Sequence, residues 1–274
     1  VASGEISGQL LGPVEVARGQ GLSLQLRIEN GTATDYPALP LRLTAFAAGG
    51  SAIHSQSVHA NVPAGATVTL AQTLDTAIWP WGPTALVLES DLGTGYRTLD
   101  SATVTVIDAQ APQIVTLEPG PDSVQPRAVQ LALLATDDRA VVAADYRIDD
   151  GAWSVLTQDG QGAERYVGLI ELPDGAHTVR FRARDAADNV ATSSGINFVV
   201  DGTPPQIAIS GVADGETYAR PVTPVVDMLD ANPGTLTLLL DDAPFSSGTE
   251  VSANGVHVLR ARANDAAGNH RERT

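Results

Sequence analysis

Nine aspartates are the residues whose type and spacing could do chemistry in this chain. They are Asp108, Asp137, Asp138, Asp185, Asp188, Asp201, Asp227, Asp230 and Asp265. Calcium takes about six to eight oxygen ligands and prefers carboxylates, carbonyls and water. No contiguous calcium loop of the Asp-x-Asp-x-Asp-Gly type, with its distal Glu, is present. Two interpretations stay open: a calcium site assembled from separate loops, or Asx turns at Asp185 and Asp265 with the other carboxylates solvated.

Two tryptophans form a second candidate site. Trp79 and Trp81 flank Pro80, so their rings could form a platform on which a sugar stacks. The competing interpretation is a pair that plugs one end of a β-sandwich or packs on the module that follows. In either role the pair lies in the connection between two predicted strands. The first of these strands ends at Leu74, and the second begins at Thr84.

No residue is assigned a catalytic role. The sequence has no Gly-x-Ser-x-Gly elbow, no His-Glu-x-x-His pair and no phosphate-cradling glycine loop. It also has no cysteine, which excludes thiolate metal sites and cysteine nucleophiles. His177 and His257 could act as bases or ligands, but a bond from each ring to a nearby turn carbonyl is the simpler expectation. We therefore expect a non-enzyme with no required cofactor and with calcium as the one candidate ion.

Charge and hydropathy limit the partners. The formal net charge is −16, and such a field repels phosphate backbones, so no nucleic acid is expected. No run of about 18 apolar residues occurs, so we expect no membrane span in these residues. The same negative charge is compatible with bound cations.

An internal repeat fixes the organisation of the chain. Residues 177–189 match residues 257–269 at eight of thirteen positions, with an offset of 80. Further upstream, Pro112-Gln113-Ile114 matches Pro205-Gln206-Ile207 with an offset of 93. The difference of 13 between the offsets indicates a deletion in the later copy. Two matching blocks in the same order predict two tandem modules of one kind.

The elements that carry these residues are short strands. Val179, Phe181 and Ala183 alternate with arginines, which is the period of a half-buried strand. Residues 22–28 show the same alternation in the first segment. About seven such strands per module, with turn signals between them, are typical of a β-sandwich. The fold class predicted is all-β, with three tandem immunoglobulin-like sandwiches forming an elongated rod because Pro-containing linkers are stiff.

The predicted modules are residues 1–108, 109–201 and 202–274. Module three ends where its last strand should begin, so we expect that strand to be truncated or completed by residues outside this sequence. Counting strands places two loops of each repeat at the pole next to the preceding module. The nine aspartates are therefore expected to converge at the two module junctions.

The Asp-Ala-Ala-x-Asn hairpins and the strands before them resemble the bacterial Ig-like repeats of large surface adhesins and secreted proteins. The resemblance covers about residues 109–274, and Asp188 replaces the usual Gly of that hairpin. Residues 1–108 resemble a related adhesion-type Ig-like module through residues 27–31 and 63–67. Some members of such families bind calcium between modules, so the resemblance implies the same candidate ion here.

These inferences predict a non-enzymatic spacer or stalk of a bacterial surface or secreted protein, adhesin-like and rigidified by calcium at the module junctions. The expected location is extracellular or at the cell surface. The expected partners are other domains of the same larger protein and a host or cell-surface glycan or protein. The alternatives are a carbohydrate- or protein-binding module, with Trp79 and Trp81 as contacts, and an accessory region beside an enzyme.

Overall fold

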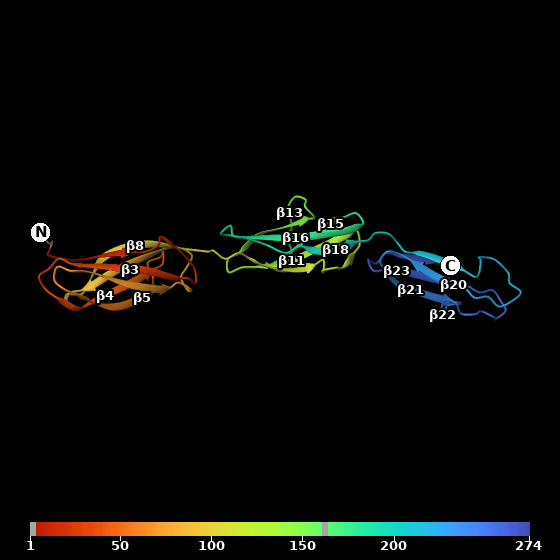
Figure 1. Ribbon diagram of the computed structural model, residues 1–274, viewed down its shortest axis with the longest axis horizontal. Coiled ribbons are helices and arrows are strands. Elements are labelled where there is room, and N and C mark those ends of the chain that lie inside the picture. Colours follow the sequence, from red (N-terminus) through yellow and green to blue (C-terminus); the bar gives the residue numbers. More distant parts are fainter. Residues whose placement is uncertain (1–3, 161–163) are drawn as a thin grey trace. The chain divides into compact units, whose positions relative to one another are not determined.

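The computed structural model describes residues 4–160 and 164–274, and all regular elements within them are strands (Figure 1). The chain divides into two compact units, Val1–Gln110 and Ala111–Thr274. The first unit contains one β-sandwich, called module one here. The second contains two, called modules two and three, which are separated by the linker at residues 201–205. Within the described residues there is no helix long and apolar enough to cross a membrane.

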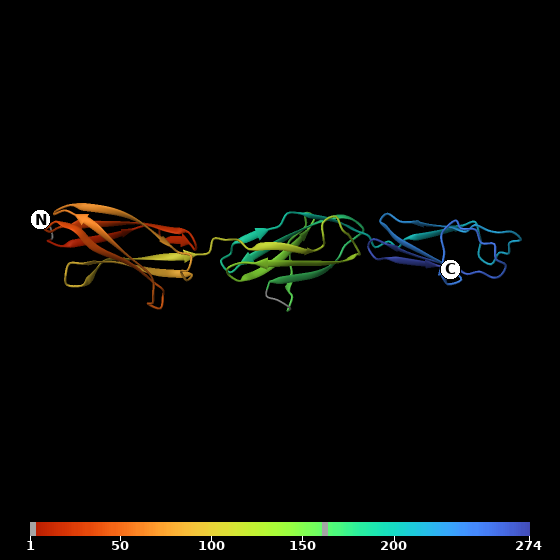
Figure 2. The ribbon, with the colours of Figure 1, turned by 90° about the horizontal axis from the view of Figure 1, so that it is seen from below.

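Module one is built from two sheets, whose layers can be followed in Figures 1 and 2. The first sheet has the order β1 (Ile6–Leu11), β3 (Gly21–Asn30) and β6 (Thr67–Asp75). The second has the order β2 (Glu15–Ala17), β8 (Tyr96–Ile107), β7 (Gly82–Asp91), β4 (Tyr36–Phe46) and β5 (Ala52–Val62). Neighbouring strands are antiparallel except β2 and β8, which pair in parallel. This is the strand order of an immunoglobulin-like sandwich.

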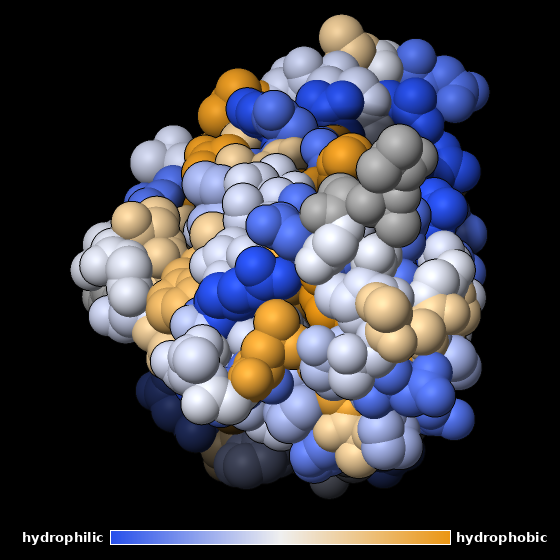
Figure 3. Space-filling view, turned by 90° about the vertical axis from the view of Figure 1, so that its left-hand side faces the viewer, coloured by the Kyte–Doolittle hydropathy of each residue, from blue (hydrophilic) through white to orange (hydrophobic). Residues whose placement is uncertain are grey.

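The core of module one follows from strand alternation. Leu22, Leu24, Leu26 and Ile28 on β3 are buried, while the residues between them are exposed. Successive side chains of a strand point to opposite faces, so this pattern turns one face of the sheet toward its partner sheet. Figure 3 looks onto one end of this module, where hydrophilic and hydrophobic residues are interspersed.

Module two repeats this topology. One sheet has the order β14 (Thr157–Gln158), β15 (Arg165–Glu171), β11 (Ala128–Thr136) and β9 (Gln113–Glu118). The other has the order β10 (Val124–Gln125), β18 (Ile196–Val200), β16 (Gly175–Asp185), β12 (Val141–Ile148) and β13 (Ser154–Val155), with β17 (Val190–Thr192) also on β16. Phe181 and Phe198 are fully buried between the two sheets.

In module three the described strands again form two sheets. Its strands are β19 (Gln206–Ser210) with β20 (Val225–Leu229), and β22 (Ala243–Pro244), β21 (Pro233–Leu240), β23 (Leu259–Asp265) and β24 (His270–Arg273) in that order. Its core contains five buried apolar residues, against twelve in module two. With less apolar area removed from water, module three gains less stabilisation from its core.

The prediction of an all-β chain of tandem immunoglobulin-like sandwiches is confirmed. The strand predicted at residues 177–184 is β16, and the alternating stretch at residues 22–28 lies in β3.

Candidate functional site

Three aspartates converge at the linker pole of module three. Asp201, Asp230 and Asp265 each offer a carboxylate oxygen, and these oxygens lie within 4.8 Å of one another. Asp201 follows β18, Asp230 follows β20, and Asp265 ends β23. Asp201 and Asp265 are buried, with exposed fractions of 5% and 6%. The convergence predicted from strand counting is therefore present for these three residues.

Amide groups compensate the charge of this cluster. The Asn232 side-chain amide donates to Asp201 Oδ2 at 2.8 Å, and the Asn269 side-chain amide donates to Asp265 Oδ2 at 2.8 Å. Backbone N–H groups of Thr203 and Asn232 donate to Asp201 and Asp230 respectively. A carboxylate can accept about four hydrogen bonds, so each keeps acceptor capacity toward a cation. The arrangement can hold the linker and could also ligate calcium.

The Asp-Ala-Ala-x-Asn hairpins close on themselves. Asp185 Oδ1 accepts the N–H groups of Ala187 at 2.7 Å and Asn189 at 2.9 Å, and its Oδ2 accepts the Asn189 amide. Asp265 and Asn269 repeat the contact between the first and last residues of the motif. This is the Asx-turn interpretation of the sequence, and it explains why the motif needs Asp at one end and Asn at the other.

Burial and hydrogen bonding act in opposite directions on the aspartates of module two. Burial alone would raise the pKa of Asp185, but the Asn189 side chain and the Ala187 and Asn189 N–H groups lower it overall. Burial raises the pKa of Asp137, with further contributions from the charges of Asp185 and Asp138, against a lowering contribution from the Arg139 N–H. Burial is thus the main reason that the pKa of Asp137 lies above its ordinary value.

Asp108, Asp188 and Asp227 lie outside the cluster of Asp201, Asp230 and Asp265. Asp108 is buried in the first unit, where its carboxylate accepts the Gln110 N–H at 3.0 Å. Two predictions need correction. Asp188 has an 81% exposed side chain that pairs with Arg184, and its backbone adopts a positive φ of 67° in the hairpin. Asp227 lies within β20 rather than in a loop, and its side chain is exposed to solvent.

The two tryptophans do not form a solvent-facing pair. Trp79 is fully buried in the core of module one, so its indole offers no face to a sugar, which corrects the glycan interpretation for this residue. Trp81 is half-buried against the same core, and the Arg18 guanidinium lies 4.7 Å from its ring centroid. The plug interpretation describes this geometry.

Both repeated histidines fasten a turn. His177 Nε2 lies 3.0 Å from the Pro173 carbonyl oxygen, and its Nδ1 lies 3.0 Å from Asp149 Oδ2. A carbonyl oxygen and a carboxylate only accept, so the ring donates at both nitrogens when it is protonated. His257 makes the same two contacts, to Ala253 and Asp241. The expected bond to a turn carbonyl is confirmed in both modules.

The carboxylate partners of these histidines were not predicted. Asp149 and Asp241 both adopt a φ of 51°, and each also accepts a backbone N–H of β16 or of the residues before β23. The sequence signal is an Asp-Asp pair present in both repeats, Asp149-Asp150 in module two and Asp241-Asp242 in module three. The pKa of both carboxyl groups is lowered. At Asp149 the chief cause is the hydrogen bond from the Thr178 N–H, and at Asp241 it is the hydrogen bond with His257.

A second unpredicted carboxylate fastens the linker to module two. Asp174 accepts hydrogen bonds from the Arg127 guanidinium, the Gly202 N–H at 2.9 Å and the Thr203 hydroxyl at 2.9 Å. Arg127, followed by Thr203 and Gly202, holds the pKa of Asp174 well below its usual range. The sequence signal is Pro-Asp-Gly at residues 173–175, which is typical of a turn and does not by itself indicate a contact with the linker.

The linker is also fastened to module three. The Asn269 side-chain amide donates to the Asp201 carbonyl oxygen at 2.8 Å, and Arg271 Nε donates to the Pro205 carbonyl oxygen at 3.0 Å. Together with Asp174, these bonds hold residues 201–205 from both sides. The linker is thus a hydrogen-bonded segment and not a free tether.

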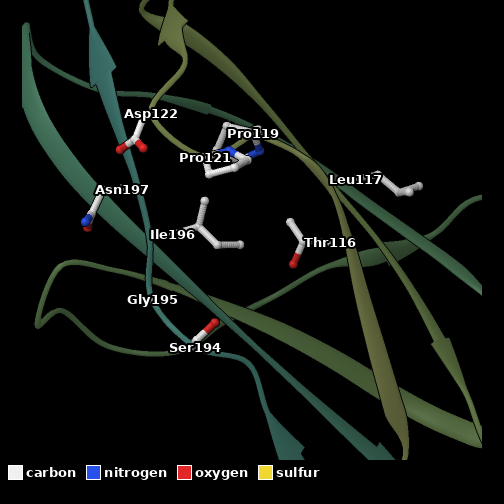
Figure 4. Close-up of a pocket in the computed structure, with 10 residues that line it drawn as sticks. Thr116, Leu117, Pro119, Pro121, Asp122, Ser194, Gly195, Ile196 and Asn197 are labelled. Atoms are coloured by element: carbon white, nitrogen blue, oxygen red, sulfur yellow. The ribbon is translucent and has the colours of Figure 1, made fainter.

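One pocket of about 460 Å³ in module two lies between the turn after β9 and the start of β18 (Figure 4). Its polar side chains include Asp122, Ser194 and Asn197. No histidine or lysine is among its lining residues, so Ser194 has no general base of that kind in the pocket.

No family model matches this chain. No curated protein sequence matches it. Among solved structures, a CARDB domain from Pyrococcus furiosus, described in complex with di-metal ions, is 13% identical with a TM-score of 0.30, covering 38% of this chain and 88% of that domain. Fibronectin(III)-like modules of CbhA from Clostridium thermocellum are 18% identical with a TM-score of 0.29, covering 70% of this chain and 93% of that one.

A transglutaminase from red sea bream is 10% identical with a TM-score of 0.35, covering 72% of this chain and 31% of the enzyme. This chain therefore spans about a third of that enzyme's length. Likenesses at these identities and TM-scores carry no argument about function.

Proposed function

We propose that the chain is a non-enzymatic spacer of a bacterial surface or secreted protein, adhesin-like, which sets the distance between other parts of that protein. The observation that carries the proposal is the linker at residues 201–205, which is hydrogen-bonded to module two through Asp174 and to module three through Asn269 and Arg271. A spacer needs connections that resist bending.

The residues whose side chains could take part in a reaction support the same proposal. His177, His257, Asp185 and Asp265 all use their polar atoms to close turns and hairpins. Groups committed to structure in this way are not poised as nucleophiles or bases, which need an open side facing a substrate.

A spacer also has to bear tension, which single-molecule stretching measures. Because each module has its own core, we expect three separate unfolding events, with module three unfolding at the lowest force. The event for module two should release roughly 30 nm of chain, from about 3.3–3.6 Å per extended residue. A single cooperative event, or extension without force peaks, would count against the spacer.

We propose in addition that calcium rigidifies the linker pole of module three. The observation behind this is the three carboxylate oxygens within 4.8 Å, two of them on buried residues. Three clustered negative charges repel one another, and a divalent cation would relieve that repulsion while bonding three oxygens from separate segments. Water and backbone carbonyls would supply the other ligands.

Melting with and without calcium tests this second proposal. A site filled at 100 times its dissociation constant stabilises by about 2.7 kcal/mol. Asp230→Asn should remove the calcium-dependent rise in Tm, whereas Asp214→Asn, at an exposed acid of the same module, should retain it. An unchanged Tm of the native chain at millimolar calcium would reject the site without touching the spacer proposal.

A further inference from the structure

Two arginines face each other on the outer surface of module two. Arg147 on β12 lies directly opposite Arg180 on β16 in the antiparallel register. Val179 and Phe181, before and after Arg180, are fully buried in the core, so Arg180 and its cross-strand partner point outward. Side chains in such a pair have Cβ atoms about 4.5–5.5 Å apart, and like charges at this spacing repel each other. The pair therefore costs stability unless another group compensates it.

The acid on this part of the sheet pairs with a different arginine. Asp145 lies opposite Arg182 and accepts a hydrogen bond from its guanidinium at 2.6 Å. No carboxylate of the described residues pairs with Arg147 or Arg180, and the Nε of Arg147 is buried there without a hydrogen-bond partner. Three guanidinium groups against one carboxylate leave an excess of two positive charges, on a chain whose formal net charge is −16.

The same strands of module three lack this arginine pair. Arg260 is the counterpart of Arg180 at the offset of 80, and Leu239 lies opposite it. Arg260 forms an ion pair with Asp242. The repeat can therefore build these strands without two facing cations. Where a local rule of strand pairing is broken and the fold does not compensate it, a functional site is expected.

The indole of Trp153 holds the guanidinium groups in place. The Cζ atoms of Arg147 and Arg182 lie 5.1 Å and 4.6 Å from the centroid of its ring. Stacking of a guanidinium on an aromatic ring is attractive, and it restricts the rotamers of a long side chain, so less conformational entropy is lost when a ligand binds. The ring itself is half-buried, and Val155, opposite Asp145 on the same face, is 78% exposed. Apolar surface therefore adjoins the cationic groups.

We propose that Arg147, Arg180 and Trp153 form a binding site for a carboxylated saccharide. The carboxylate lies between the two guanidinium groups, whose paired N–H donors match its two oxygens, and its charge relieves their repulsion. The apolar face of the sugar ring lies against the exposed part of the indole and Val155. A net charge of −16 repels densely charged polyanions, so a sugar with a single carboxylate fits this small patch best. This inference is independent of the spacer and calcium proposals.

The test titrates the full chain with sodium glucuronate and follows the indole N–H signals of its tryptophans by NMR. The chain has three tryptophans, so Trp79 and Trp81 of module one serve as internal references. We expect the Trp153 signal to shift saturably, with a dissociation constant on the order of 1 mM. Glucose, which has the ring without the carboxylate, should cause no shift at the same concentrations.

Variants at the two arginines show which groups bind the sugar. Arg180→Gln and Arg147→Leu should each weaken glucuronate binding by roughly tenfold or more, because each removes charge-assisted hydrogen bonds to the carboxylate. Arg147→Leu copies the pair of Leu239 and Arg260 in module three, so it should fold normally. The matched control, Arg260→Gln, removes an arginine of module three and should bind glucuronate as the native chain does.

Two further ligands separate a saccharide from other carriers of a carboxylate. Acetate lacks the sugar ring and should bind roughly tenfold more weakly than glucuronate, so equal binding would overturn the saccharide assignment. Tighter binding of an oligoglutamate peptide would also overturn it, because the patch would then fit an acidic protein. The proposal fails as well if glucuronate causes no saturable shift at Trp153, or if the shift survives Arg180→Gln unchanged.

Discussion

At the scale of single residues, the same carboxylates that suggest a metal site also close the hairpins of the repeat. Asp185 and Asp265 accept bonds from the Asn four residues later, which needs no ion. The sequence predicted both roles, because Asp and Asn at that spacing are suited to Asx turns and to ligation alike. It could not separate them, since the outcome depends on which loops of distant strands lie next to each other.

Removing a hairpin carboxylate should destabilise its module. Asp185→Ala leaves the N–H groups of Ala187 and Asn189 and the Asn189 amide without their acceptor in a fully buried position. We expect a loss of about 2–4 kcal/mol in the unfolding free energy of module two, measured by urea titration. Asp188→Asn, at an 81% exposed side chain whose positive φ Asn also tolerates, should change it by less than about 0.5 kcal/mol. Equal losses in both variants would contradict the hairpin role.

The histidine turns should make stability depend on pH. Asp241, followed by the Ala253 carbonyl, raises the pKa of His257 above 6.5. Burial alone would lower the pKa of His177, but Asp149 and the Pro173 carbonyl raise it overall. Raised histidine pKa values stabilise the fold below pH 6.5, and this contribution is lost as pH rises through the folded-state pKa. The lowered pKa values of Asp149 and Asp241 stabilise the fold above pH 3.8, and this contribution is lost as pH falls through the folded-state pKa.

The contribution of each His–Asp pair is therefore largest between roughly pH 4 and 6.5. Urea midpoints of the native chain and of His257→Gln, measured from pH 4 to 9, should differ most in that window and converge above it. A difference that is constant with pH would show that the ring acts through packing alone.

At the scale of elements, the strands were predictable and their pairing was only partly so. Period-two alternation identified β3 and β16, because their apolar residues face a core and the others face solvent. The order of strands within sheets followed from the sandwich topology. The short strand β10, with two residues, carries no pattern, and neither does the register shift between β21 and β23 near Pro233. These features depend on contacts between segments distant in sequence.

Gly234 marks that register shift and should not tolerate a side chain. A Cβ at this position would lie 2.6 Å from the Asn264 carbonyl oxygen and 2.8 Å from the Asp265 carbonyl carbon, both on the backbone of β23. We expect Gly234→Ala to destabilise module three by about 1–3 kcal/mol in thermal unfolding. Gly120→Ala, where a Cβ would meet nothing within 4 Å, is the control. An unchanged Tm for Gly234→Ala would mean that β21 and β23 approach less closely than described.

At the scale of the whole molecule, the tandem organisation was evident from the repeat, but the fastening of the linker was not. Prolines at positions 204 and 205 indicated a stiff connection. The bonds from Asp174 and Asn269 come from turns and hairpins of the two flanking modules, and no local pattern shows that these turns reach the linker. Trp79 illustrates the same limit, since its burial follows from packing against strands far away in sequence.

The central claim is that hydrogen bonds from modules two and three hold the linker at residues 201–205. Its most direct test is the distribution of distances between spin labels on these two modules. The chain has no cysteine, so Val155→Cys and Leu229→Cys, at positions 78% and 60% exposed, give unique labelling sites. We expect one narrow distance peak in the native chain. The peak should broaden with Asp174→Ala, which removes the acceptor of the Gly202 N–H and the Thr203 hydroxyl. It should be unchanged by Asp214→Ala. A broad distribution in the native chain, unaffected by Asp174→Ala, would contradict the account of a fastened linker.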